Sequence, residues 1–182
     1  MIQPTLAFVR DQLNLYFNQQ INPNVDYVII NNVIDPDNSI PSENQNKLVL
    51  TLTNIENEVI RGVPSFKHDA KDLKKNAITA INMDVLMGSN FNQYEESLSF
   101  LSSAISFLHS NPIYQPDSFP SLPSAIDKIT IEDKKLSYED IHNLWQSLGA
   151  KYRPSIVYKF RVLFRDSNDV IVQPMVKARK DD

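Results

Sequence analysis

The sequence predicts an α+β fold in which a mixed, mostly antiparallel sheet is packed by about three helices. Apolar residues recur every three or four positions in several segments and alternate with polar residues in others, which indicates both helices and strands. The expected helices are inserted among the strands along the chain, an order typical of α+β proteins. Because 182 residues with 42% hydrophobic and 22% charged content suit one globular unit, residues 1–182 are expected to form a single domain.

The first half of the chain predicts one helix followed by strands. Residues 3–20 form an amphipathic pattern with Pro4 in the first turn, where its missing N–H is tolerated. Leu48, Leu50 and Leu52 are expected to share one face of a strand. Residues 56–76 show no period, so a long loop or arm is expected there. Strands are predicted at residues 25–34, 47–55 and 78–87.

The middle of the chain predicts a turn and a second helix. Residues 88–90 (Gly-Ser-Asn) are expected to turn, and Asn92 to cap a helix that ends before Pro112. The apolar stripe of this helix is predicted to contain Tyr94, Leu98, Leu101, Ile105 and Leu108.

The last third predicts two strands around a short helix, with a tail. Ser137 and Asp140 have the spacing of a capping box, Trp145 lies on the apolar stripe, and Gly149 suits the left-handed end of that helix. The short strand is expected at residues 125–131 and the stronger one at 155–165, where an aromatic face alternates with a basic one. A hairpin turn at 166–169, a last strand at 170–172 and a flexible tail at 177–182 are expected after it.

The composition favours a binding or assembly protein over an enzyme. No cysteine is present, so thiolate nucleophiles and thiolate zinc sites are excluded. The three glycines are far apart, and His68, His109 and His142 lie outside any known ligand or catalytic spacing. We therefore expect no catalytic residue, no metal and no cofactor. No apolar run reaches the roughly 18 residues of a membrane span, and no signal sequence is visible, so a soluble protein made in the cytoplasm is expected.

Charge is distributed unevenly around a net value of −4. Residues 1–150 hold 10 basic and 18 acidic side chains, giving −8, whereas residues 151–182 hold 8 and 4, giving +4. The negative total argues against nucleic acid as the main partner. The separation of the two signs along the chain favours surfaces that meet complementary neighbours. Chance on a solvated surface explains this separation equally well. The candidate interface residues are the basic side chains Lys159, Arg161, Arg165, Arg61, Lys67, Lys177 and Arg179. A solvated sheet face without a partner remains open for the row Lys159, Arg161 and Arg165.

Several stretches, taken in order, resemble one known family. They are residues 2–11 (IQPTLAFVRD), 48–58 (LVLTLTNIENE), 81–86 (INMDVL), 91–101 (FNQYEESLSFL) and 144–161 (LWQSLGAKYRPSIVYKFR). In their order and spacing these look like the cap, or tail-terminator, proteins of phage-tail-like contractile injection systems, such as the antifeeding prophage and the insecticidal virulence cassettes. The Trp145 and Tyr152-Arg153-Pro154-Ser155 block is the most specific part.

The resemblance implies a tail-terminator-like fold and a structural function. It implies a homohexameric ring that closes the distal end of the inner tube and sheath and stops their elongation, without catalysis, nucleic acid or membrane insertion. It also implies assembly in the bacterial cytoplasm, after which the protein is part of the injection particle. Two alternatives remain at this point: an adaptor or chaperone that binds tube or sheath subunits without entering the particle, and a small nucleic-acid-binding protein that uses the basic row.

Overall fold

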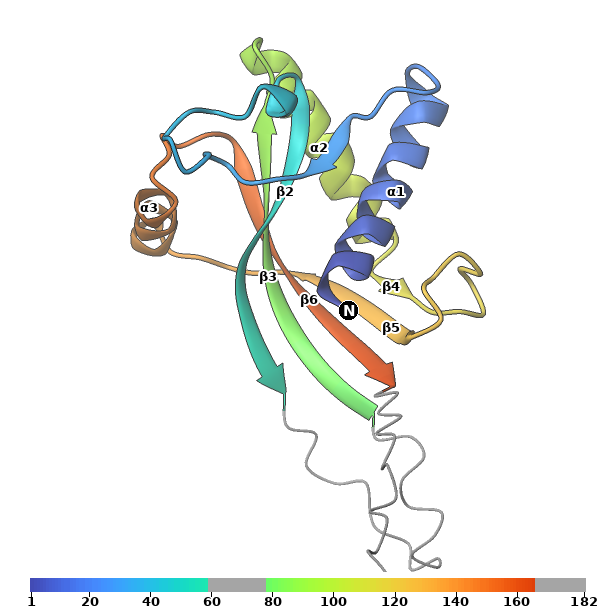
Figure 1. The fold of residues 1–182 in the computed structure, drawn as a ribbon. Helices are drawn as coiled ribbons and strands as arrows, with labels where there is room; N and C mark the ends of the chain where they lie inside the picture. The colour runs from blue at the N-terminus through green and yellow to red at the C-terminus, as the bar shows by residue number, and fades with distance from the viewer. Residues whose placement is uncertain (59–77, 166–182) are drawn as a thin grey trace, which may run out of the picture.

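A computed structural model describes residues 1–58 and 78–165, which form one six-stranded sheet with helices on both faces (Figure 1). The strand order is β1-β2-β3-β6-β5-β4. The helices are α1 (Ile2–Gln20), α2 (Tyr94–Ser110), α3 (Tyr138–Ser147) and the short 3-10 helix η1 (Ser42–Asn44). The strands are β1 (Val28–Ile30), β2 (Lys47–Glu58), β3 (Ile78–Asn90), β4 (Ile113–Tyr114), β5 (Ile126–Asp133) and β6 (Ser155–Arg165).

The sheet is mixed and mostly antiparallel, as the sequence predicts. β1 pairs with β2 in parallel, and every other neighbouring pair in the described sheet is antiparallel. The long central strands β2, β3 and β6 twist together and extend past the helices at one end (Figure 1). Ile78 pairs with Arg165, and Glu58 pairs with Ala80, so residues 59–77 and 166–182 are both attached to this same end.

The main core lies between the sheet and the two long helices. The predicted alternation is confirmed, since Met83 and Val85 on β3 and Phe160 and Val162 on β6 are fully buried on the face covered by α1 and α2. Phe17 joins them from α1 and also packs against Phe100 of α2, with ring centroids 5.2 Å apart. Burial of this apolar surface supplies most of the driving force for the fold.

A buried amide attaches α1 to the edge of the sheet. The Asn14 side chain accepts hydrogen bonds from the main-chain N–H groups of Tyr27 and Val28 and donates one to the Val28 carbonyl, each at 2.8 Å. An unpaired main-chain group would be costly at this buried position. Asn14 therefore takes the place that a further strand would occupy beside Val28.

The opposite face of the sheet carries α3 and a smaller core. Trp145, which is 4% exposed, packs with Leu86 of β3 and Val157 of β6. The predicted capping box is present: the Ser137 hydroxyl accepts from the Asp140 N–H, and the Asp140 carboxylate accepts from the Ser137 N–H. Gly149 has the predicted left-handed conformation, with φ of +69°. Local signals therefore place α3, and Trp145 holds it on the sheet.

Several predicted boundaries are wrong, and strand pairing explains most of the errors. The predicted turn at residues 88–90 is part of β3, because Lys47 to Val49 pair with these residues. β2 continues to Glu58 and shortens the predicted loop. The predicted strand at 25–34 is reduced to Val28–Ile30, since β1 pairs with β2 over only these residues.

The predicted buried stripe of α2 is also partly wrong. The helix begins at Tyr94 without a side-chain cap, so Asn92 is not its cap. Tyr94 and Leu98 are exposed at 67% and 41%. The buried face instead contains Ser97, Leu101, Ala104 and Leu108. The Ser97 main-chain carbonyl accepts a hydrogen bond from the Ser89 hydroxyl of β3 at 2.9 Å. This bond holds Ser97, in the first turn of α2, against β3.

The predicted turn at 166–169, the last strand and the tail at 177–182 lie outside the described residues.

We predict that Trp145→Ala destabilises the protein by about 3–5 kcal/mol, because it leaves a cavity between α3 and the sheet. Denaturant unfolding followed by circular dichroism measures this loss; the chain has one tryptophan, so fluorescence cannot be used for the variant. Tyr138→Ala is the control, since Tyr138 lies on the same helix at 94% exposure. Unchanged stability in Trp145→Ala would contradict a core role for this side chain.

Candidate functional site

An irregularity in β2 decides which side chains reach the outer face of the sheet, the face that carries α3. Leu52 pairs with Val85, whereas the next registered pair is Asn54 with Asp84. Thr53 is therefore an extra residue, a β-bulge that shifts the alternation by one position. As a result Asn54, Glu56 and Glu58 face outward, although they have the same parity as the inward-facing Leu52.

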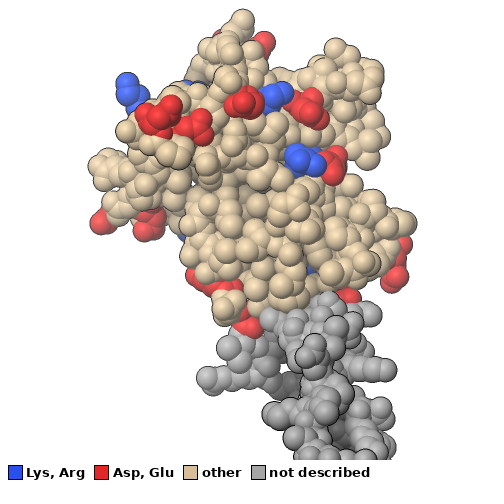
Figure 2. All heavy atoms as spheres, in the orientation of Figure 1, with Lys and Arg blue, Asp and Glu red and all other residues tan. Residues whose placement is uncertain are grey.

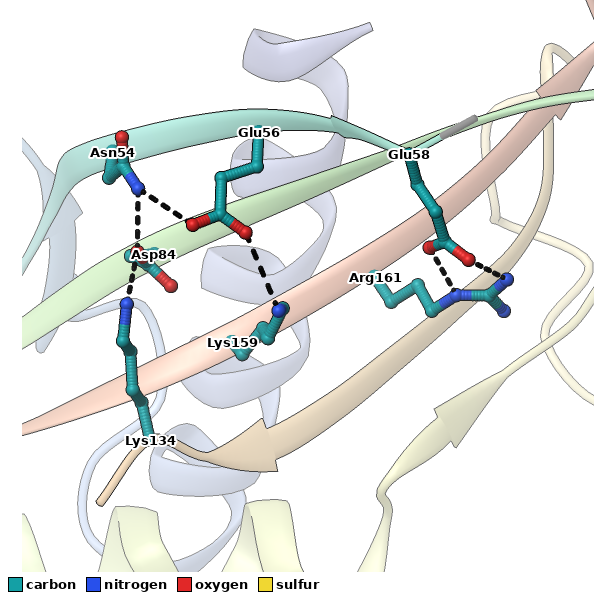
Figure 3. A network of polar contacts seen from close by, with 7 residues as sticks. All are labelled: Asn54, Glu56, Glu58, Asp84, Lys134, Lys159 and Arg161. Atoms are coloured by element: carbon teal, nitrogen blue, oxygen red, sulfur yellow. Dashed lines mark hydrogen bonds and ion pairs between the residues drawn. The ribbon is translucent and has the colours of Figure 1, made fainter. Parts of the chain in front are cut away.

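Charged side chains from four segments meet on this outer face (Figure 3). Arg161 binds Glu58 through two hydrogen bonds, 2.7 Å from Nε to Oε2 and 2.9 Å from Nη2 to Oε1. Lys159 lies 3.6 Å from Glu56. Asn54, Asp84 and Lys134 lie beside these pairs. We call the seven residues together the charged ladder: Asn54, Glu56, Glu58, Asp84, Lys134, Lys159 and Arg161.

Asp84 is the buried member of the charged ladder. Its side chain is 7% exposed, and its Oδ2 accepts from Lys134 Nζ at 2.6 Å and from Asn54 Nδ2 at 3.0 Å. A carboxylate removed from water in this way is tolerated only when charged and polar donors surround it. Lys134 comes from the segment between β5 and α3, so this ion pair also fixes the entry to α3.

The paired groups perturb one another at the solvent-exposed end of the ladder. The hydrogen bonds from Arg161 are the largest cause that holds the pKa of Glu58 below its ordinary value of 4.5. The same contact raises the pKa of Arg161. Two parallel N–H···O bonds between guanidinium and carboxylate are among the stronger polar contacts in proteins, and they favour the ionised form of Glu58 in the folded chain.

The structure places only part of the predicted basic set. Lys159 and Arg161 lie on the outer face of β6, opposite its aromatic core face, as predicted. Their nearest acidic groups belong to the same chain. Arg165 ends β6, and nothing is described of its side chain. Arg61, Lys67, Lys177 and Arg179 lie outside the described residues.

Sequence reasoning missed the acidic half of the charged ladder. Glu56 and Glu58 fall in the predicted loop at residues 56–76, and Asp84 falls in the predicted strand at 78–87 with no signal that connects it to them. Glu58 and Arg161 are separated by 103 positions, so no local spacing connects them. Ile55 is the one apolar residue in the run from Asn54 to Glu58, so no alternation of polar and apolar residues indicates that the strand continues.

The described histidines do not form a reactive group. His109 Nε2 lies 2.9 Å from Asp133, and both side chains are about half exposed; His68 lies outside the described residues. Across residues 1–58 and 78–165, no three His, Asp or Glu side chains are grouped as metal ligands. None of the helices in these ranges is long and apolar enough to cross a membrane.

Comparison with known protein families shows which family the chain belongs to. The family described as the Pvc16 N-terminal domain matches residues 5–178. The chain belongs to this family. The match includes all six strands and the three α-helices of the described fold except the first residues of α1. No curated protein matches the chain by sequence.

Two solved structures resemble this member of the Pvc16 N-terminal domain family. One is the sheath/tube terminator of an extracellular contractile injection system, PVC, in the extended state, with 17% identity and a TM-score of 0.56 over 100% of this chain and 62% of that chain. The other is the tube-terminating cap of the anti-feeding prophage, with 16% identity and a TM-score of 0.49 over 94% of this chain and 60% of that chain. The chain thus spans less than two thirds of each solved chain, and the first likeness confirms the predicted terminator-like fold.

We predict that Lys134→Met destabilises the protein by about 1–3 kcal/mol, because it leaves the buried Asp84 carboxylate without its charged partner. The double variant Lys134→Met/Asp84→Asn should recover part of that loss. Urea unfolding at pH 7 measures all three proteins, with Lys135→Met as the control on an exposed neighbour. Equal losses in Lys134→Met and Lys135→Met would show that the ion pair contributes nothing.

We predict that the ion pair of Glu58 and Arg161 stabilises the protein at neutral pH and not in acid. The folded pKa of Glu58 is lowered, so its contribution is present above the ordinary pKa and is lost as pH falls through the folded value. Arg161→Gln should therefore be less stable than the natural chain at pH 7, with a smaller difference near pH 3. Urea unfolding at both pH values tests this, and Lys135→Gln should show no such change with pH.

Proposed function

We propose that the chain acts as a terminator of a contractile injection system, forming a homohexameric ring that closes the distal end of the inner tube and sheath and stops their elongation. The observation that carries this proposal is the shared fold over the whole chain with a sheath/tube terminator. Membership of the Pvc16 N-terminal domain family supports it. On this proposal the protein performs no catalysis, its partners are tube and sheath proteins, and it assembles in the bacterial cytoplasm before entering the particle.

The distribution of charge supports a structural role. A ring of identical copies joined head to tail needs two different patches on each copy, each complementary to the other. The described residues hold 10 basic and 16 acidic side chains, a net of −6, whereas residues 59–77 hold 5 and 2, a net of +3. One chain thus carries both signs in separate segments.

Our proposed contact region with the tube, sheath or neighbouring copy is the end of the sheet where Glu58, Ile78 and Arg165 lie, far along the strands from α3. Arg165 ends β6 here, and Arg61, Lys67, Lys177 and Arg179 belong to the segments 59–77 and 166–182, which are attached to this end. Lys159 and Arg161 contribute less net charge, since Glu56 and Glu58 already pair with them. Exposed ion pairs contribute roughly 0–1 kcal/mol each, so a ring gains from their repetition in every copy.

We predict that Arg61→Glu/Lys67→Glu leaves the fold intact and gives particles of uncontrolled length. Electron microscopy of particles from producing cells measures tube length and end structure, and native mass spectrometry of capped ends should give six copies of the 20.8 kDa chain. The matched control, Glu95→Lys/Glu96→Lys, changes exposed charges on α2. Particles of normal length that do not contain this protein would favour an adaptor or chaperone instead.

A further inference from the structure

A groove of about 720 Å³ runs along the open edge of β1. Its floor is the edge itself, Val28 to Asn31, and four carboxylates line it: Asp11, Asp26, Asp35 and Glu43. Arg10 also lines the groove and is paired with Asp11 at 2.7 Å. Acidic side chains gather across the upper part of the face seen in Figure 2, over the segments between α1 and β2.

Three of the four carboxylates in the groove are available to a partner. Asp26, Asp35 and Glu43 make no ion pair among the described residues. Lys47 lies at one end, where its ammonium donates to the main-chain carbonyl of Asp26. The groove therefore remains net negative and would attract a segment rich in lysine and arginine.

The edge of β1 is also open to main-chain pairing beyond Val28. The Tyr27 carbonyl and the Asn31 N–H bond to β2, so the alternation of a strand directs the main-chain groups of Val28 and Ile30 away from β2. Asn14 takes both groups of Val28. The N–H and C=O of Ile30 face the groove without such a cover.

We infer that this groove binds residues 59–77 of a second copy of the chain. The inference deepens the ring proposed above and rests on it. The segment supplies the complementary charge, since its basic residues outnumber its acidic ones by 5 to 2. Its lysines lie close together in sequence, which suits several carboxylates that line one groove. The basic residues are Arg61, Lys67, Lys71, Lys74 and Lys75.

The reach of the chain favours a segment that comes from another copy. Ile30 lies level with Leu50, and Leu50 lies level with Met87, nine residues along β3 from Ile78. That distance is about 30 Å at roughly 3.3 Å per residue. Lys71 and Lys75 precede Ile78 by seven and three residues, so they extend at most about 25 Å and 10 Å from it. Lys75, the lysine nearest to β3, therefore cannot reach the groove of its own chain.

A synthetic peptide of residues 61–76 tests the groove directly. Added to the full chain in 50 mM salt, it should bind, and Asp26→Lys/Asp35→Lys should weaken the binding at least tenfold. A peptide with Lys71→Glu and Lys74→Glu should reverse this order and prefer the lysine variant. Binding should weaken with rising salt, because screening reduces the attraction, and Glu95→Lys/Glu96→Lys should bind like the natural chain.

A charge exchange between full chains tests the same contact in assembly. Asp26→Lys/Asp35→Lys and Lys71→Glu/Lys74→Glu should each fail to self-associate on ultracentrifugation, and an equimolar mixture should associate, because each groove then meets a complementary segment. Absence of peptide binding, equal binding to both groove variants, or a mixture that behaves like the separate variants would overturn the inference. Such a result would leave the terminator function standing, since tube length in producing cells reports on that function independently.

Discussion

One extra residue in β2 determines how both faces of the sheet are used. Without the bulge at Thr53, the alternation that directs Leu52 inward would carry Glu56 and Glu58 onto the same face. Two carboxylates would then lie beyond the apolar core, on the face where Ile55 and Asn57 are exposed, and on the opposite face from Lys159 and Arg161. With the bulge they face outward and meet Lys159 and Arg161. The inward positions become Ile55 and Asn57, which pair with Met83 and Ile81.

The outer face is consequently divided into an apolar half and a charged half. Leu86 and Val157 lie at the end covered by α3 and pack against Trp145. The positions farther along the same strands carry Asp84, Lys159 and Arg161. Asp84 lies at the boundary, where Lys134 reaches it from the segment that leads into α3. Packing of the helix and neutralisation of the charges are therefore coupled through one buried carboxylate (Figure 3).

Features encoded by neighbouring residues were predictable from the sequence, and features that depend on distant pairing were not. The capping box of Ser137 and Asp140, the left-handed Gly149 and the alternation of β6 are read within a few positions. The end of β3 was mistaken for a turn because Gly-Ser-Asn has turn chemistry, whereas pairing with β2 keeps it extended. The basic side of the candidate site was found because it alternates within one strand. Its acidic partners were missed because a bulge does not appear in local periodicity.

Ion pairs in the charged ladder make the distribution of net charge in the folded chain different from its distribution along the sequence. Divided by sequence, the first 150 residues are acidic and the last 32 are basic. In the folded chain Lys159 and Arg161 are compensated by Glu56 and Glu58. At distances beyond a few ångströms such pairs contribute little, because opposite charges close together cancel in the surrounding field. The field of the described residues is therefore that of a −6 body. Residues 59–77 carry a net charge of +3 by sequence, so the relevant separation of charge is between the described residues and this segment rather than between the two halves of the sequence.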